Sequence, residues 1–402
     1  MPDSADPAPA ADRETRQRAE RALLERFADD ASHGGDLRAR VLRRQHAWAD
    51  SLRETAHGGR QSFSTPAGTL NYSYQRYDLR RVDCDWLQLV HGLHLSQRAA
   101  HGAFTSSGMG AISAVTATLA RHGWTTIEIS PDPYFEVPWL VSRLHPSLSV
   151  TETPTFGDGA AVVWLDTISS TWPELPHQRG SAHLLVIDTS CLEPDSPHVA
   201  AWLARADELS LPTVLVRSHI KLDCFGQEVG RLGSVIVVAP SDDPTGVDVL
   251  ARDIREAVSL LGATVEPARL YPWLGDPEFL ELARWRTEAI RASTRRLGDE
   301  LSRRLGGRDD MAVLARAHET SVLVRLPPGT AESEPSISRR VADLCERSDL
   351  PVAAAGSFGL DRIAVTDFID LRDGRHYLRV CGSDVPPNVE YAVAEAIVEV
   401  LT

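Results

Sequence analysis

The stretch that governs the fold reads Thr213-Val-Leu-Val-Arg-Ser-His-Ile-Lys221-Leu-Asp-Cys-Phe-Gly-Gln-Glu-Val-Gly-Arg231-Leu-Gly233. It begins as a short apolar run typical of a buried strand and passes into a glycine-flanked turn. Lys221, just beyond that strand, is the only lysine in a chain with 42 lysines and arginines together. Arginine stays protonated, whereas a buried lysine can lose its proton and act as an amine nucleophile. Lys221 is therefore a candidate for amine chemistry, although chance retention in an arginine-rich chain explains the count equally well.

Similar apolar runs recur on both sides of this stretch, and helical patterns separate them. The expected strands are residues 126–130, 161–166, 184–188, 213–217 and 234–238, and the expected helices include 110–122 and 198–209. Such alternation predicts an α/β fold with a mostly parallel sheet sandwiched by helices. In sheets of this kind, ligands bind at the C-terminal ends of the strands.

Three parts are expected along the chain. Residues 1–65 form an N-terminal helical extension, 66–285 a large ligand-binding domain, and 286–402 a linker helix with a smaller α+β domain. Within these parts we expect two helices between residues 13 and 57, an extended arm at 58–75, a long helix at 277–305, strands at 320–326, 362–367 and 376–380, and helices at 337–347 and 388–401.

Composition narrows the classes of function. A formal charge of -14 argues against a nucleic-acid-binding surface, and the sequence has no run of about 20 apolar residues that would cross a membrane. The first residues lack the features of a signal peptide. The five cysteines are scattered without a CxxC pair, which predicts reduced thiols in a cytoplasmic protein: Cys84, Cys191, Cys224, Cys345 and Cys381.

The stretch around the lysine resembles the cofactor-binding segment of the fold-type I pyridoxal-phosphate (PLP) enzymes. That segment reads Ser-x-x-Lys followed by a Gly-Arg-Gly-like turn, and Ser218, Lys221 and Arg231 are the matching positions. The resemblance implies that Lys221 forms the Schiff base and that Ser218 and Arg231 bind the phosphate. The lysine-to-arginine spacing is longer here than in the common aminotransferases.

A carboxylate must keep the pyridine nitrogen of PLP protonated so that the ring can accept electrons. Asp188 ends an expected strand 33 residues before Lys221, an order that is similar to the family's. The resemblance implies that Asp188 has this role. The alternative is an aspartate that caps the following turn.

The turn Thr105-Ser-Ser-Gly-Met-Gly-Ala-Ile-Ser-Ala114 resembles the Ser-Gly-Met-x-Ala turn of the cystathionine γ-synthase-like branch. It implies that Ser107, Gly108 and Met109 bind the phosphate at a helix N-terminus. A dinucleotide fingerprint is the competing interpretation, but the third glycine is missing and no acidic residue ends the next strand.

Two loops resemble those that hold the cofactor ring. The family's stacking tyrosine matches Tyr134, with Phe135 as the alternative and loop packing as the plain interpretation. Where the family has an asparagine that binds the phenolic oxygen, this chain has Ser170, which is a departure.

The remaining matches concern the partner subunit and the substrate. Tyr74 and Arg76 resemble the arm that reaches a partner's phosphate across a homodimer, although a surface strand would look the same. Ser357, in Gly356-Ser-Phe-Gly359, and Arg379 resemble small-domain residues that bind the substrate, with Arg379 gripping its carboxylate.

Four histidines allow both a functional and a structural interpretation. His219 lies two residues before the lysine and either relays protons or packs. His91, His94 and His101 lack an accompanying ligand set, so solvated histidines are expected and no metal site.

The resemblance implies an enzyme that acts on a small-molecule amino acid. We expect γ-elimination, γ-replacement or carbon–carbon bond formation in specialised metabolism, with an O-activated homoserine or S-adenosylmethionine as donor and a nicotinamide nucleotide as a potential acceptor. The first alternative is a PLP-dependent aminotransferase. The second is a catalytically inactive protein that binds or regulates.

Overall fold

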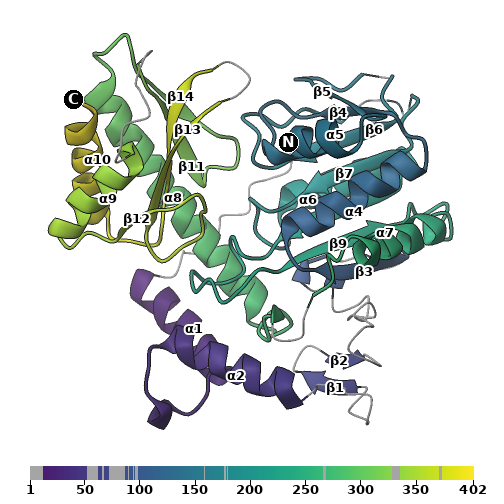
Figure 1. The fold of residues 1–402 in the computed structure, drawn as a ribbon, viewed down its shortest axis with the longest axis horizontal. Helices are drawn as coiled ribbons and strands as arrows, with labels where there is room; N and C mark the ends of the chain where they lie inside the picture. The colour runs from purple at the N-terminus through teal and green to yellow at the C-terminus, as the bar shows by residue number, and fades with distance from the viewer. Residues whose placement is uncertain are drawn as a thin grey trace, which may run out of the picture.

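The computed structural model describes residues 12–51, 62–65, 68–71, 87–88, 90–93, 95, 98–157, 159–175, 178, 180–265, 269–327, 336–370 and 374–402. Tyr74, Arg76, Cys84 and His94 lie outside these ranges. Two sheets and the long helix between them organise the described part (Figure 1).

Within the described residues, the large sheet has seven strands in the order β3-β9-β8-β7-β6-β4-β5. Its strands are β3 (Ala100–Thr105), β4 (Thr126–Ile129), β5 (Ser149–Glu152), β6 (Val162–Asp166), β7 (Leu184–Asp188), β8 (Thr213–Ser218) and β9 (Gly233–Val238). The block from β5 to β8 is parallel, whereas β9 runs antiparallel to both of its neighbours. The expected mostly parallel sheet is confirmed.

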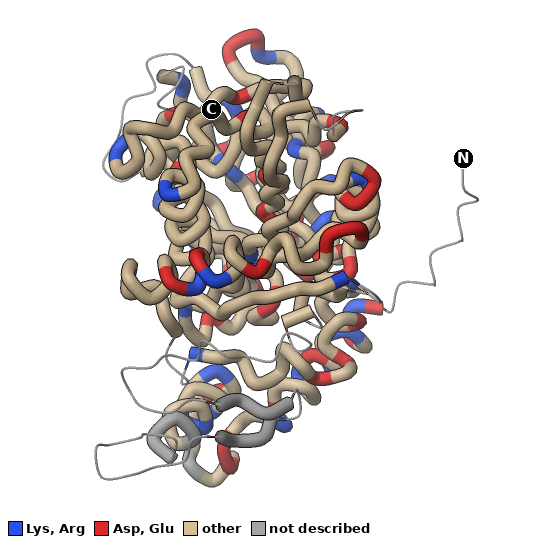
Figure 2. Tube along the Cα trace, turned by 90° about the vertical axis from the view of Figure 1, so that its right-hand side faces the viewer, with Lys and Arg blue, Asp and Glu red and all other residues tan. Residues whose placement is uncertain are grey.

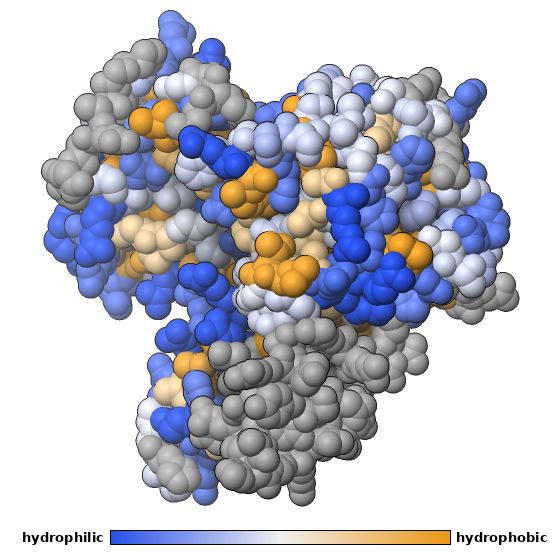
Figure 3. Space-filling model, turned by 45° about the vertical axis from the view of Figure 1, so that its right-hand side comes forward, coloured by the Kyte–Doolittle hydropathy of each residue, from blue (hydrophilic) through white to orange (hydrophobic). Residues whose placement is uncertain are grey.

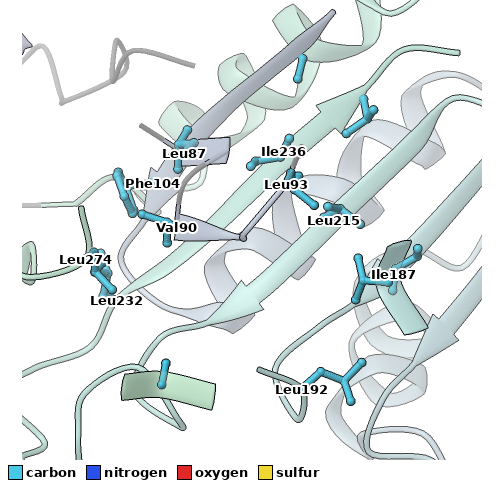
Figure 4. Close-up of a cluster of buried hydrophobic side chains, with 14 of the residues drawn as sticks. Leu87, Val90, Leu93, Phe104, Ile187, Leu192, Leu215, Leu232, Ile236 and Leu274 are labelled. Atoms are coloured by element: carbon cyan, nitrogen blue, oxygen red, sulfur yellow. The ribbon is translucent and has the colours of Figure 1, made fainter. Parts of the chain in front are cut away.

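The central strands are buried on both faces, and successive side chains enter different cores. In β7, Leu185 and Ile187 belong to one apolar cluster, whereas Leu184 and Val186 belong to another. This alternation follows from the two-residue period of a strand. Figure 4 shows part of the first cluster, in which Ile187, Leu215 and Ile236 come from neighbouring strands.

Helices supply the outer layer of both clusters. The first cluster takes side chains from α1 (Arg13–Arg26), α2 (Leu37–Ser51), α6 (Pro197–Glu208) and the start of α8 (Phe279–Leu305). The second takes them from α4 (Gly108–Arg121), α5 (Glu136–Leu144) and α7 (Asp248–Leu260). Helices α4, α5 and α7 pack directly on strands of the sheet, whereas α1 packs on α2 and α8. Burying one leucine or valine side chain in such an apolar stripe contributes about 1.5–3 kcal/mol.

The smaller sheet has the order β10-β11-β14-β13-β12 within the described residues. Its elements are β10 (Ala312–Ala315), β11 (Ser321–Arg325), α9 (Ile337–Arg347), β12 (Val352–Ala354), β13 (Ile363–Ile369), β14 (His376–Cys381) and α10 (Pro387–Leu401). Helix α8 contributes Phe279 to the core of the large sheet, Ile290 to a small cluster at the junction and Leu297 to the core of the small sheet. The expected division at residues 285/286 falls inside this helix.

At the N-terminus, α1 and α2 are separated by a short 3-10 turn, η1 (Ala31–His33), and lie below the two sheets in Figure 1. A hairpin of β1 (Ser62–Thr65) and β2 (Gly68–Asn71) follows them. Leu23 and Leu24 of α1 are buried in the first cluster, so this helix is not confined to the surface. Acidic and basic residues are interspersed along the trace in the view of Figure 2.

Some surface and sequence features bear on the expectations. No described helix is long and apolar enough to cross a membrane. Helix α5 and the residue before it expose large apolar side chains, with Phe135 60% and Trp139 51% exposed, and Figure 3 shows that apolar groups gather in patches on one face of the molecule. The described cysteines, Cys191, Cys224, Cys345 and Cys381, are free and buried.

Candidate functional site

Three polar side chains lie at one edge of the large sheet, at the C-terminal ends of neighbouring strands. Asp166, the last residue of β6, lies beside Asp188, the last residue of β7. Ser218 ends the next strand, β8. All three have the parity of residues such as Trp164, Val186 and Val216, whose side chains pack on the face covered by α4. The strand ends therefore present two carboxylates and a hydroxyl on the same face.

The N-terminus of α4 is brought to this edge by close packing that only glycine allows. A Cβ at Gly108 would lie 2.7 Å from the Cβ of Ser218, and one at Gly233 would collide with the backbone of Ser107 and Gly108. Ser107 caps the helix, because its Oγ accepts a hydrogen bond from the N–H of Gly110 at 3.0 Å. The first N–H groups of a helix have no acceptor inside it and attract anions. Beside Ser218, the structure thus places a cradle for a small anion.

The two aspartates at the strand ends differ in their partners. Asp188 Oδ1 accepts a hydrogen bond from the N–H of Ser190 at 2.8 Å. Asp166 accepts from the N–H groups of Tyr134, at 2.8 Å, and Ile168, at 3.0 Å. Burial and the neighbouring charge of Asp188 raise the pKa of Asp166 to about 7. Burial also raises the pKa of Asp188, although Ser190 and nearby cations oppose this.

Asp166 fixes the loop that carries Tyr134. The N–H of Tyr134 is its donor, and the ring of Tyr134 contacts Phe135 edge-on, with centroids 5.2 Å apart. Burial raises the pKa of the Tyr134 hydroxyl, and Glu136 adds to the effect. Tyr134 is also close enough to Asp188 for that carboxylate to influence its pKa. The phenol is therefore neutral at this edge of the sheet.

Lys221 lies where the two sheets meet. Its Nζ donates a hydrogen bond to Ser357 Oγ at 3.2 Å and lies 5.2 Å from the centroid of the Phe358 ring. Gly359 packs directly on the carbonyl of Lys221, at a φ of 80° that disfavours other residues. Burial lowers the pKa of Lys221, and the charge of Arg379 lowers it further. Both effects favour the neutral amine, which is the nucleophilic form.

Arg379 approaches the same place from the small sheet. It lies on β14 between Leu378 and Val380, whose side chains enter the core of that sheet. Its own side chain therefore points to the opposite face of the sheet. Its Nη2 donates to the carbonyl of Gly356 at 2.7 Å. Its Nε is buried and has no partner among the described residues. A buried donor without a partner costs free energy, which a bound carboxylate would recover.

His219 is part of a different buried cluster. Its Nδ1 bonds Asp223 Oδ2 at 2.6 Å, and its Nε2 bonds Ser234 Oγ at 2.8 Å. Asp223 also holds Arg217 through two hydrogen bonds of 2.7 and 2.6 Å, and His91 Nε2 bonds the same Ser234 hydroxyl at 2.7 Å. Since both ring nitrogens of His219 are engaged, the structure favours the packing interpretation over a proton relay to Lys221.

Several expected residues are not joined to this site by a described contact. Arg231 is exposed, and Ser170 is half-buried without a described hydrogen bond. Tyr74 and Arg76 lie outside the described residues. His101 forms an ion pair with Asp248 at 3.0 Å. Across the described residues, no group of three or more His, Cys, Asp or Glu side chains could hold a metal ion.

Sequence reasoning missed two residues that shape the site. Asp166 could have been found, because it ends an expected strand in the same manner as Asp188. Arg316 carried no such signal: it follows β10 and donates to the carbonyls of Asp132, at 3.2 Å, and Ile168, at 2.9 Å. These carbonyls belong to the loops of Tyr134 and Ser170, so Arg316 ties the small sheet to the edge of the large one.

Comparison with solved structures places this architecture among known folds. Apo CalE6, a methionine gamma lyase from Micromonospora echinospora, has a TM-score of 0.54 and 16% identity, and the match covers 87% of this chain and 96% of that one. metB from Corynebacterium glutamicum gives 0.54 and 14%, covering 89% and 98%. Cystathionine gamma-lyase from Lactobacillus plantarum, complexed with L-serine, gives 0.55 and 14%, covering 95% and 98%.

No protein-family model matches the sequence, and no curated protein matches it either. The likeness to solved structures therefore rests on architecture rather than on sequence identity. It extends over both sheets and the helices that cover them, since most of each chain is matched. The chain has the fold of the fold-type I PLP enzymes, and the three solved structures named above are enzymes of their Cys/Met branch.

Proposed function

We propose that this chain is a PLP-dependent enzyme that acts on an amino acid, with Lys221 as the residue that bonds the cofactor aldehyde. One observation carries the proposal. The only lysine, a buried strand-end aspartate and a glycine-built helix N-terminus converge at the C-terminal edge of a fold-type I sheet. Lysine chemistry, a ring-nitrogen partner and a phosphate cradle are what this cofactor requires.

The side chains present fit the cofactor. The amides of Gly108 and Met109 at the start of α4, with Ser218 beside them, would hold the phosphate. Asp188 would hold the protonated ring nitrogen, and Tyr134 would cover the ring. When bound, PLP supplies an electron sink for carbanion chemistry at the substrate. The Ser107 hydroxyl is already used in the helix cap, so its proposed share in phosphate binding would come from its backbone.

The residues of this chain would then have distinct tasks. Arg379, with its unpartnered Nε, would orient the substrate carboxylate. The Nζ of Lys221 would accept the proton from the substrate Cα, for which its lowered pKa suits it. Asp188, buried beside Asp166, would keep its negative charge because the protonated ring nitrogen of the cofactor would neutralise it.

For the reaction, we propose β/γ-lyase or γ-replacement chemistry on a substrate with a leaving group at its side chain. Two of the similar solved structures are lyases, which favours this class over transamination. An O-activated homoserine or S-adenosylmethionine as donor, a nicotinamide nucleotide as acceptor and a role in specialised metabolism are finer parts of the same proposal. We also propose a cytoplasmic homodimer in which Tyr74 and Arg76 reach the partner's phosphate.

The first experiment tests the cofactor. The purified full chain is mixed with PLP, its visible absorbance is recorded, and the sample is reduced with borohydride and digested for mass spectrometry. We expect an absorbance band that Lys221→Ala lacks, and a cofactor mass on the peptide containing Lys221. A colourless chain that takes up no PLP would contradict the proposal.

A second experiment separates the reaction classes. The loaded protein is incubated with amino acids that carry a leaving group and, separately, with simple amino donors. The proposal expects release of the leaving group without accumulation of pyridoxamine phosphate. Accumulation of pyridoxamine phosphate would instead assign an aminotransferase, and the absence of both products would point to a protein that binds PLP without catalysis.

A further inference from the structure

A buried ion pair joins the N-terminal helix to the domain junction. Glu20 of α1 and Arg286 of α8 are 6% and 2% exposed, respectively. Arg286 Nη1 donates to Glu20 Oε2 at 2.8 Å. The contact therefore bridges residues that are far apart in the sequence and that belong to the extension and to the long helix.

The same guanidinium reaches the turn that touches Lys221. Arg286 Nη2 donates to the carbonyl of Gly359 at 3.1 Å and to Asp361 Oδ1 at 2.8 Å. Gly359 in turn packs on the carbonyl of Lys221. Ser357, two residues earlier, accepts the hydrogen bond from Lys221 Nζ. A continuous series of contacts thus runs from α1 to the lysine backbone and to its amine.

The neighbourhood of the ion pair is loosely filled. Cavities of about 350 Å³ and about 510 Å³ flank it, and Arg286 and Asp361 line both. Glu20 Oε1 and Arg286 Nε are buried without a partner among the described residues. Burial raises the pKa of Glu20 to about 7, although Arg286 opposes the shift. A buried ion pair with unsatisfied atoms contributes little net stability, so stability alone is a poor reason for its presence.

Helix α1 makes further contacts with the C-terminal part of the chain. Arg16 forms an ion pair with Asp384 at 2.7 Å, and Arg13 and Gln17 donate to the Asp384 carbonyl at 3.0 and 3.2 Å. Asp384 follows β14, the strand that carries Arg379. Helix α1 therefore contacts the C-terminal part directly at Asp384 and, through Arg286, the turn that carries Gly359.

We propose that Glu20 and Arg286 are positioning residues for Lys221, and that α1 sets the turn at residues 356–359 against the lysine. This inference rests on the proposed function for its catalytic meaning. It adds that the N-terminal extension belongs to the support of the site. Removing the Glu20 carboxylate frees the guanidinium to tilt toward Asp361 and into the cavities, which loosens the Gly359 contact and the Ser357–Lys221 hydrogen bond.

Because Lys221 is the only lysine, its amine can be followed selectively in the full chain without cofactor. The rate of acylation by an acid anhydride is measured across pH, and peptide mass spectrometry separates Lys221 from the N-terminal amine. In Glu20→Ala, we expect the midpoint of this profile to rise by about one pH unit toward that of an ordinary lysine, because the amine becomes less buried.

The matched control is Glu25→Ala, which lies on the same helix and pairs with Arg40 at 2.8 Å, away from the junction. It should leave the Lys221 profile unchanged. Glu20→Gln, which keeps an oxygen for Arg286, should restore most of the normal profile. Glu20→Asp keeps the charge but withdraws it by one methylene, so it provides a milder variant if Glu20→Ala fails to fold.

In the PLP-loaded protein, kcat of Glu20→Ala should fall by up to about 100-fold, because the amine that accepts the proton is displaced. If Glu20→Ala and Glu20→Asp leave the acylation profile the same as that of Glu25→Ala, the inference is wrong. A chain that takes up no PLP would defeat the proposed function, whereas the acylation profile would still decide whether Glu20 positions Lys221.

Discussion

Two polar clusters near the C-terminal end of β8 differ in how completely their hydrogen bonds are satisfied. In one cluster, Arg217 and His219 share Asp223, and the charged and ring nitrogens of this group are satisfied by short hydrogen bonds. In the other cluster, Ser218 and Lys221 border Asp188, and Arg379 keeps a buried donor without a described partner. Successive residues of one strand thus serve different purposes.

The difference shows how buried charge can be interpreted. A charge that is fully hydrogen-bonded inside the chain has no capacity left for a ligand, so it acts on conformation. A buried charged group that lacks a hydrogen-bond partner gains most from a molecule that supplies that partner. The completeness of the hydrogen bonding, rather than the residue type, separates the two clusters.

The largest effect is expected for the cluster of Arg217, His219 and Asp223, whose hydrogen bonds are complete. Asp223→Asn leaves the guanidinium of Arg217, which is 1% exposed, without its anionic partner. Loss of one partner of a buried pair costs about 3–5 kcal/mol, so we expect a fall of that size in the free energy of unfolding. Urea denaturation measures it.

Two variants sharpen that result. Glu208→Gln removes the same charge from an exposed ion pair with Arg205, and its cost should stay below about 1 kcal/mol. The double variant Arg217→Met/Asp223→Leu should recover part of the loss, since it removes both charges together. If Asp223→Asn were as mild as Glu208→Gln, the structural role of this cluster would be refuted.

In the other cluster, where Arg379 lacks a described partner for its Nε, Asp188→Asn should affect activity more than stability. Removing a charge that stabilises developing charge in an enclosed site typically costs about 100- to 1,000-fold in kcat. Stability should change little, because Asp188 is a buried carboxylate whose own pKa is raised by burial. Steady-state kinetics and urea denaturation of the same preparation provide the two readings, and a variant that loses stability while keeping kcat would reverse the assignment.

Arg379→Met should weaken substrate use without unfolding the chain. A charge-assisted hydrogen bond is worth about 1.5–3 kcal/mol, so kcat/KM should fall by about 10- to 100-fold. We expect the effect to appear mainly in KM and to be smaller for an amine substrate that lacks the carboxylate. Equal losses for both substrates would show that Arg379 does not bind the carboxylate.

The last expected effect is a difference in the sign of the pH dependence. Arg217 overcomes the effect of burial and lowers the pKa of Asp223 to about 2, so its contribution is present above pH 3.8 and is lost as pH falls toward 2. Asp166 has the opposite sign: its pKa is raised from 3.8 to about 7, so the folded state binds the extra proton and stability falls as pH rises through that window.

Urea denaturation across pH tests both signs. Asp166→Asn should remove a downward slope of at most about 1.4 kcal/mol for each pH unit between pH 4 and 7. Asp223→Asn should instead remove an acid-side slope below pH 4. If both variants changed the pH dependence of the unfolding free energy in the same direction, the distinction between the two clusters would be contradicted.

The sequence was a good guide to the sheet and to the strand ends. The short Val-, Ile- and Leu-rich runs that become β6 to β9 are buried on both sides, and this burial makes them recognisable. Asp188 and Ser218 follow from the same strands. Strand β3 was missed, because Ala100-His-Gly-Ala-Phe-Thr has few β-branched residues and forms only by pairing with β9.

The partners of the charged residues could not be read in the same way. Arg217 and Arg231 lie in one stretch of sequence, and only the packing shows that Arg217 is buried with Asp223 whereas Arg231 is exposed. The Glu20–Arg286 contact links residues that are 266 positions apart, and no local period encodes such a distance. Long-range pairing of arginines therefore required the structure.

The position of β3 at the edge of the sheet has a consequence for synthesis on the ribosome. The parallel strands β4 to β8 can assemble as soon as they emerge, but β3 pairs only with β9, whose residues are made more than a hundred positions later. His91 and Glu20 likewise wait for Ser234 and Arg286. Glu20, His91 and β3 thus remain without these partners until residues 233–286 have been made, and the β3 edge of the sheet is closed after strands β4 to β8 have formed.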